Sequence, residues 1–289
     1  MKNQILKHKV VFFYIFTFLI TWPSWLLMGR IVRASPGRGG IVLFFSTLGG
    51  LGPLLALFLI EKLSGKREVG KGIFSRIRYK NTHMRWILLA ALLYPSITLL
   101  SQYFHSWIGD NGPIRFIKPE IDHLGVFVVP VMVIHFVASL LTSPLFEEPG
   151  WRGFALVNLQ NKYGRFTGSL IVGVLWWIWH QPMNIPFGIL PSAYAFAQML
   201  TFSFFIDSLF NLANRNLFVA MLAHQSYGTI YTFLNQGSSS MFQLVCLVLV
   251  VIGLRVKERS IARRPIGQTE TLGLGGTGDT NAVPGGSNS

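Results

Sequence analysis

The sequence predicts an all-α protein, a polytopic bundle of about eight transmembrane helices with both the N- and the C-terminus on the cytoplasmic side. Three observations predict this fold. Only 12% of the 289 residues are Asp, Glu, Lys or Arg, about half of the roughly 25% usual in soluble domains. Eight apolar segments are candidates for the roughly 17–25-residue helices that cross a bilayer. The basic residues cluster between alternate pairs of these segments. With only eleven acidic residues, the scarcity of charge excludes a soluble globular domain and a disordered chain.

Each helix is expected where a long apolar segment carries few charges. The first segment, 10–28, contains Trp22 and Trp25 where a signal peptide would carry a small-residue cleavage site, so a retained helix is expected. The fifth is expected to be broken by Pro182 and Pro186, because proline removes a backbone donor. The expected spans are 10–28, 41–60, 86–104, 124–146, 168–190, 193–210, 217–233 and 241–254.

The distribution of Lys and Arg tests this assignment, since cytoplasmic loops carry an excess of both. With the N-terminus inside, the outer segments hold only five of the 25 basic residues, namely Arg30, Arg33, Arg38, Arg115 and Lys118. A wrong number of spans would mix the charges between the two sides. The net charge of +14 is therefore attributed to a multi-pass protein of the cell membrane, in contact with anionic lipid, and not to a nucleic-acid partner.

The composition divides the chain into a transmembrane domain, 1–264, and a polar tail, 265–289. The tail is rich in Gly, Thr, Asn and Ser without apolar periodicity, so it is expected to be disordered and to carry no chemistry. The single Cys246 excludes a disulfide framework and a cysteine-based zinc site. The His-Glu-x-x-His spacing of many zinc proteases does not occur either.

Ionisable side chains inside the spans are functional candidates, because a charge at mid-bilayer costs at least about 2.5–3.5 kcal/mol. The densest group is Glu147, Glu148 and Arg152. In a continuous helix Glu148 and Arg152 lie one turn apart in the favourable order for an ion pair, whereas Glu147 points about 100° away. Glu147 then serves as a general base; the alternative is a surface salt bridge at a cytoplasmic helix end. Pro149 is expected to disturb the helix at Glu148.

Two histidines complete the candidate site. His180 follows a cluster of tryptophans, which indicates either an aromatic belt at the membrane interface or, beside the prolines, the wall of a cavity. His224 lies among small apolar residues, where a hydrogen-bonded core histidine is the alternative to a catalytic one. His135 and Asp207 are expected to make hydrogen bonds between helices. Together the carboxylates and histidines supply a base, a proton partner and oxyanion donors, as peptide hydrolysis requires.

Three motifs resemble those of the CPBP family of intramembrane proteases. They are Glu147-Glu148-x-x-x-Arg152, Trp176-x-x-x-His180 and His224 in a later helix, in this order, within about 126–233. The family includes CAAX prenyl proteases of the Rce1 type and bacterial proteins linked to bacteriocin processing or immunity. The resemblance implies an endopeptidase whose active site opens to the cytoplasm and whose peptide or protein substrate is prenylated or is a bacteriocin precursor.

The resemblance also implies a role for each motif. Glu147 and His180 are expected to activate a water molecule, His224 to help form the oxyanion hole, and the other two residues of the first motif to support the site. The third motif of the family often has Asn four residues after its histidine, where this chain has Gly228, so one donor of the oxyanion hole is missing. No cofactor is required by the sequence, and a divalent metal such as zinc remains an open alternative.

Two other classes of function are kept beside the protease. A non-catalytic membrane protein that confers bacteriocin immunity, or that serves as a scaffold, would retain the same fold. A transporter would use the broken helix at Pro182 and Pro186 to line a substrate site. The absence of a visible internal repeat in the sequence counts against the transporter.

Overall fold

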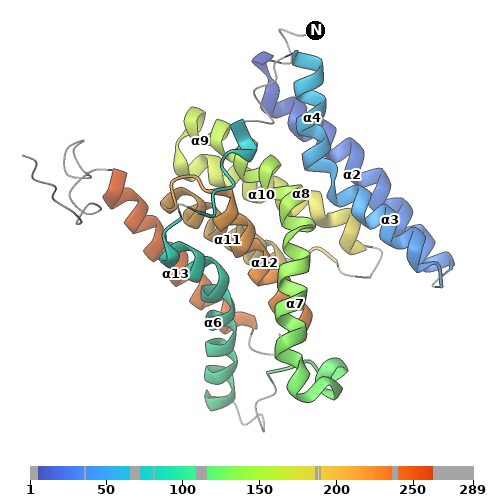
Figure 1. The fold of residues 1–289 in the computed structure, drawn as a ribbon, viewed down its shortest axis with the longest axis vertical. Helices are drawn as coiled ribbons and strands as arrows, with labels where there is room; N and C mark the ends of the chain where they lie inside the picture. Colours follow the sequence, from blue (N-terminus) through green and yellow to red (C-terminus); the bar gives the residue numbers. More distant parts are fainter. Residues whose placement is uncertain are drawn as a thin grey trace, which may run out of the picture.

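The computed structural model describes residues 6–35, 37–65, 72–80, 82–108, 116–185, 188, 190–235 and 240–262. The regular structure of these residues is helical, apart from one isolated bridge between Ile117 and Leu234. Figure 1 shows long helices that run side by side with short connections. The all-α prediction is confirmed. The predicted tail, 265–289, lies outside the described residues.

The eight predicted spans all overlap helices. In chain order the helices are α2 (Lys9–Ala34), α3 (Gly39–Gly50), α4 (Gly52–Ser64), α6 (Met84–Ile108), the 3-10 helix η1 (Pro119–Phe127), α7 (Val128–Leu140), α8 (Ser143–Glu148), the π-helix η2 (Pro149–Leu156), α9 (Val157–Tyr163), α10 (Arg165–Asn184), α11 (Ala193–Leu212), α12 (Leu217–Phe233) and α13 (Ser240–Ala262).

Not all of these helices are long and apolar enough to cross a membrane alone. Among the described residues four meet that condition, α2, α6, the run Pro119–Tyr163 and α11, and a fifth is added if the bent pair α3–α4 forms one span. α12 has only 17 residues. The protein therefore has several membrane-spanning helices, while the number of about eight stays a prediction.

Two predicted spans are interrupted. The segment 41–60 is divided into α3 and α4, which are bent by 50° relative to each other. The segment 124–146 begins in η1, continues as α7 and restarts as α8 after Thr142, whose φ of −114° and ψ of −104° are not helical. Neither break was expected, because apolar composition predicts membrane burial but not the straightness of a helix.

The helix does not stop at either described proline, but its geometry changes near both: α10 ends at Asn184, two residues after Pro182, and α8 gives way to the π-helix η2 at Pro149. α10 passes through Pro182 and continues to Asn184, because proline removes one backbone hydrogen bond near a helix end and only two further residues follow. Pro149 has φ of −56° and ψ of −40°, and Glu148 before it is also helical. Proline's fixed φ suits the first position of a new helical turn, so Ser143–Tyr163 forms one continuous helical run. Pro186 lies outside the described residues.

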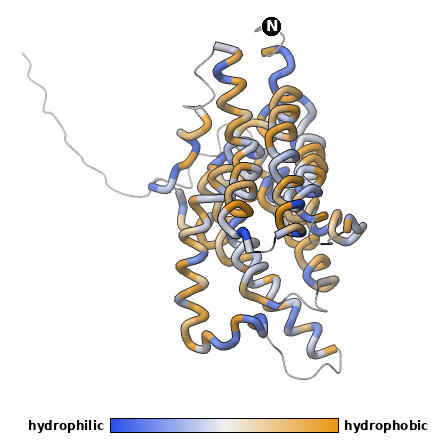
Figure 2. Tube along the Cα trace, turned by 90° about the vertical axis from the view of Figure 1, so that its right-hand side faces the viewer, coloured by the Kyte–Doolittle hydropathy of each residue, from blue (hydrophilic) through white to orange (hydrophobic). Residues whose placement is uncertain are grey.

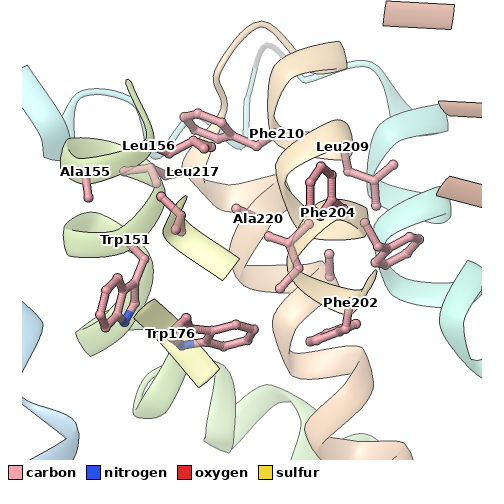
Figure 3. Packing of buried hydrophobic residues seen from close by; sticks show 14 of the residues in the cluster. Trp151, Ala155, Leu156, Trp176, Phe202, Phe204, Leu209, Phe210, Leu217 and Ala220 are labelled. Carbon is pink, nitrogen blue, oxygen red and sulfur yellow. The ribbon is translucent and has the colours of Figure 1, made fainter. Parts of the chain in front are cut away.

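The core of the bundle is rich in aromatic side chains. Trp151, Trp176 and Trp179 are fully or almost fully buried. Figure 3 shows Trp176 beside Phe202, and their stacked rings lie 6.1 Å apart. The rings of Trp151 and Trp179 meet edge to face at 5.5 Å. These contacts join η2, α10 and α11 around the segment that carries Glu147, Glu148 and Arg152.

Basic residues gather at one end of the bundle, which we call the basic end. There Arg76 donates to the carbonyl oxygen of Gly153 (2.7 Å) and Arg78 to that of Asn214 (2.6 Å), which docks the segment 72–80 over η2 and the α11–α12 connection. Apolar residues run along the helices between the two ends (Figure 2). The positive-inside rule predicts that the basic end faces the cytoplasm.

Candidate active site

The first motif forms a buried ion pair. Arg152 Nη1 lies 3.1 Å from Glu148 Oε1, and both side chains are fully buried. The predicted pairing one turn apart is confirmed, and burial excludes a surface salt bridge. The residues between them belong to η2, the π-helix. Such turns are rare and occur often at functional sites.

Arg152 also binds two residues of α11. Its Nε donates to Asp207 Oδ1 and its Nη2 to Ser203 Oγ, both at 3.0 Å. Its guanidinium lies over the ring of Trp176, with 4.4 Å from Cζ to the ring centroid. One buried arginine therefore ties the first motif to α10 and α11.

His224 joins the same network from α12. Its Nδ1 donates to Glu148 Oε1 at 2.7 Å. Glu148 Oε1 thus accepts hydrogen bonds from both Arg152 and His224. Because Nδ1 is hydrogen-bonded to Glu148, the other ring nitrogen, Nε2, is the one that can interact with a substrate.

Glu147 points to a different set of partners, as the helical period predicts. Ser143 Oγ donates to its Oε1 (2.6 Å) and Trp176 Nε1 donates to its Oε2 (3.1 Å). The residue is 4% exposed. A carboxylate oxygen can accept two hydrogen bonds, so each oxygen of Glu147 keeps one acceptor site for a water molecule.

His180 is oriented by its own helix. Its Nδ1 donates to the carbonyl oxygen of Trp176 (2.8 Å), which assigns the proton to Nδ1 and leaves the lone pair on Nε2. The ring meets the rings of Trp176 and Trp179 edge to face, with centroids 5.2 and 4.6 Å away. In this tautomer Nε2 can accept a proton from water.

His180 and His224 line one cavity of about 280 Å³ between α10, α11 and α12. Trp176 is part of its wall, and its ring lies edge to face with both histidines. Glu147 is not a lining residue; it reaches the wall through its hydrogen bond to Trp176. The structure thus brings four of the five predicted site residues into contact with one tryptophan, joins Glu148 to them through Arg152 and His224, and places two of the five on the cavity itself.

The cavity lies in the half of the bundle away from the basic end. Its other lining residues include Asn184 at the end of α10, Tyr194 at the start of α11 and Tyr231 near the end of α12. These helix ends are the ones that the predicted topology places outside. The predicted topology therefore places this cavity towards the outside, whereas the family resemblance implies a site that opens to the cytoplasm. The two predictions disagree.

Three residues of the network were not among the predicted site residues. Ser143 binds Glu147, while Ser203 and Asp207 bind Arg152. Ser203 and Asp207 lie one turn apart on the predominantly apolar helix α11, and this spacing is a signal that the sequence does carry. The predicted role of Asp207, a bond between helices, is confirmed. His135 lies elsewhere, with its ring 5.1 Å from that of Phe233.

The described side chains of the site do not form a ligand set for a divalent metal. Among the described residues no group of three or more His, Cys, Asp or Glu side chains is placed to hold one. His180 and His224 each have a ring nitrogen that could coordinate, but Glu147 does not line their cavity, and its oxygens are held by Ser143 and Trp176. Zinc sites of enzymes usually have three protein ligands. The described residues do not fit that pattern.

The fold and the site define an α-helical membrane protein with a buried Glu–Arg–His network, and comparisons with known proteins agree. Residues 129–230 match the family described as type II CAAX prenyl endopeptidase, Rce1-like. The chain is 27% identical over 178 residues to CAAX prenyl protease 2 of Methanococcus maripaludis. This match covers 61% of the chain. The chain is also 24% identical over 245 residues to lysostaphin resistance protein A of Staphylococcus haemolyticus. This match covers 83% of the chain.

These matches confirm the resemblance to the CPBP family that the three motifs predict. The matched family region contains Glu147, Glu148, Arg152, His180 and His224. Each match spans 63% of the length of the relative concerned. Because about a third of each relative has no counterpart in the match, the activity of the whole protein is a proposal.

Proposed function

We propose that the protein is an intramembrane endopeptidase in which Glu147 and His180 activate water. The observation that carries the proposal is the arrangement around Trp176. Its indole nitrogen holds the carboxylate of Glu147, and its ring forms the wall of the cavity that His180 and His224 line. The similarity to CAAX prenyl protease 2 supports the same class of reaction.

The proposed reaction needs no group beyond water and these side chains. Water gives a proton to Glu147 or to Nε2 of His180 while its oxygen bonds to the carbonyl carbon of the substrate. The electron pair of the carbonyl moves to oxygen, where His224, when it carries both protons, donates from Nε2. The carbon–nitrogen bond then breaks, and the transferred proton passes to the amine. A carboxylic acid and an amine leave.

Glu148 and Arg152 are proposed to hold His224 in place. Their ion pair is fully buried, and the hydrogen bond from His224 to Glu148 fixes which ring nitrogen faces the cavity. These two residues therefore act through His224 and do not themselves touch the substrate.

We propose a peptide or protein substrate that reaches the cavity from within the membrane. The wall is largely aromatic, with Trp176, Trp177, Phe202 and Tyr227 among its residues. Such a wall suits an apolar group beside the scissile bond, in keeping with the prenyl group named for the relative. A bacteriocin precursor is the second substrate proposed, and membrane lipid surrounds the site in either case.

A non-catalytic role is the second candidate function. The similarity to a protein named for lysostaphin resistance favours it, because this match covers the larger share of the chain. In that case the buried network would only stabilise the bundle. The transporter alternative is not tested at Pro186, which lies outside the described residues; α10 continues through Pro182 and ends at Asn184.

Replacing His180 by alanine separates the two candidates. For the protease we expect peptide cleavage by the purified protein to fall by about 100-fold or more, because the proton acceptor at the cavity is removed. Cleavage is measured in nanodiscs with a set of quenched fluorescent peptides, both prenylated and unmodified. The resistance to lysostaphin of cells that express the variant is measured in parallel. Full resistance together with unchanged peptide cleavage would reject the catalytic assignment of His180.

Replacing Gly228 by asparagine is expected to increase cleavage. A Cβ at Gly228 meets only the side chain of Gln225, at 3.6–3.8 Å, so a side chain fits there. An added amide donor would supply the second arm of the oxyanion hole, and one such donor changes the rate by about 10²–10³-fold in other enzymes. We expect a rise in kcat of about tenfold or more. Gly228→Ala, which adds no donor, is the control and should leave kcat unchanged.

Cysteine labelling decides which side of the membrane the cavity faces. In a Cys246→Ser background we expect Asn184→Cys, at the cavity, to react with a membrane-impermeant maleimide added to intact cells. Lys62→Cys, at the basic end of α4, is the control and should react only after permeabilisation. If Asn184→Cys reacts only after permeabilisation as well, the cytoplasmic opening implied by the family resemblance is the correct one.

A further inference from the structure

A second cavity lies at the basic end, between α10, α11 and α13. Its volume is also about 280 Å³. Phe166 of α10 and Phe204 of α11 form part of an apolar wall, and three arginines line the same cavity, Arg165, Arg255 and Arg259. No step of the proposed hydrolysis uses this cavity.

Arg255 has donors that the described residues leave without a partner. Its Nη1 donates to Glu258 Oε2 (3.2 Å), and its Cζ lies 4.7 Å from the centroid of the Phe204 ring. Its Nε and Nη2 are buried and have no hydrogen-bond partner among the described residues. These two nitrogens form the edge of a guanidinium that binds two oxygens of one anion. Because unbonded buried donors are costly, an anion is expected at this edge.

Positive charge exceeds negative charge around the cavity. Glu258 is the one acidic lining residue, and its side chain is only 2% exposed. It lies 3.2 Å from Arg255 and 3.8 Å from Arg165. Among the lining residues one carboxylate faces three guanidinium groups, while the buried Asp207 also interacts with Arg255 from behind the wall. The lining keeps an excess of positive charge, which favours an anionic ligand.

The surroundings of the cavity indicate that this anion belongs to a lipid. Phe166, Ile252 and Val256 line it and are 58%, 54% and 61% exposed, which offers an apolar surface on the outside of the bundle. The arginines lie at the basic end, which faces the anionic inner leaflet. An acyl chain along these apolar residues would place a phosphate at the level of the arginines.

We infer that this cavity binds an anionic phospholipid, with its phosphate at Arg165, Arg255 and Arg259 and one acyl chain along Phe166, Ile252 and Val256. The inference is independent of the proposed proteolysis. It names a site where lipid of the inner leaflet contacts α11, the helix that also carries Ser203 and Asp207.

Native mass spectrometry of the full chain in detergent tests the inference by titration with dioleoylphosphatidylglycerol. We expect the first lipid to bind at least about fivefold more tightly than dioleoylphosphatidylcholine, which has the same chains but no net charge. Arg255→Gln should weaken the binding by about fivefold, the usual effect of one basic residue at an anionic surface. The exposed Arg259→Gln should do the same without disturbing the fold. Lys62→Gln, at the same end but outside the cavity, is the matched control.

The other outcomes reject the inference. Equal affinity for the two lipids would mean that only the acyl chains bind. Displacement of phosphatidylglycerol by millimolar inorganic phosphate would indicate a site for a soluble anion. An unchanged affinity for phosphatidylglycerol in Arg259→Gln would show that the arginines of this cavity do not bind the headgroup. If Arg255→Gln fails to fold, the result for Arg259→Gln alone tests the inference.

Discussion

Glu147→Gln is expected to reduce peptide cleavage by about 10²–10⁴-fold, the usual contribution of a general base. Glutamine can still accept a hydrogen bond from Trp176 or Ser143 through its carbonyl oxygen, so the site keeps its shape. It cannot take a proton from water. The loss should therefore appear in kcat, with KM and the unfolding midpoint close to those of the unchanged protein.

Cleavage of a quenched fluorescent peptide by protein in nanodiscs measures this effect. Glu120→Gln is the matched control, because it removes a carboxylate from an exposed position of η1 and should leave kcat unchanged. If Glu147→Gln retains the full kcat, the water is activated elsewhere and the proposed mechanism fails. If both variants lose activity together with stability, the network is structural.

Arg152→Gln is expected to lower the free energy of unfolding by about 3–5 kcal/mol, which is typical when one partner of a buried ion pair is removed. Arg152 is fully buried between Glu148 and Asp207. Glutamine cannot bind both carboxylates, so at least one negative charge is left buried without a counter-charge. Unfolding by sodium dodecyl sulfate in mixed micelles, followed by tryptophan fluorescence, measures the change.

A second variant tests whether buried charge is the cause. Asp207→Asn added to Arg152→Gln removes one of the stranded carboxylates, and we expect the double variant to be more stable than Arg152→Gln alone. Lys162→Gln, an exposed change near the end of α9, is the control and should lie within about 0.5 kcal/mol of the unchanged protein. A double variant that is less stable than the single one would contradict the explanation.

Much of the candidate site follows from the period of a single helix. Glu148 and Arg152 are four residues apart, so their pairing needs only a continuous helix. The same period separates Glu147 from that pair, and the structure gives it other partners, Ser143 and Trp176. The two prolines marked the neighbourhood of two changes in helix geometry, at Pro149 and Pro182, but not the kind of change, because that depends on the packing of the run that contains them.

Contacts between helices could not be predicted in the same way. The bonds from Arg152 to Asp207 and from His224 to Glu148 join residues that are 55 and 76 positions apart. Their formation depends on the angles at which α8, α11 and α12 pack. The sequence marked Asp207 and His224 as unusual in apolar helices, but it did not assign their partners.

The sequence by itself determined the helical membrane fold, the basic end and the residue types of the site, since hydropathy, charge and helical period are properties of neighbouring residues. Only the tertiary structure decided that Trp176 lies between Glu147 and the two histidines, that the cavity lies away from the basic end, and that Arg255 lines a second cavity. Those features depend on side chains from separate helices meeting in space, and local sequence periodicity does not determine how helices pack against one another.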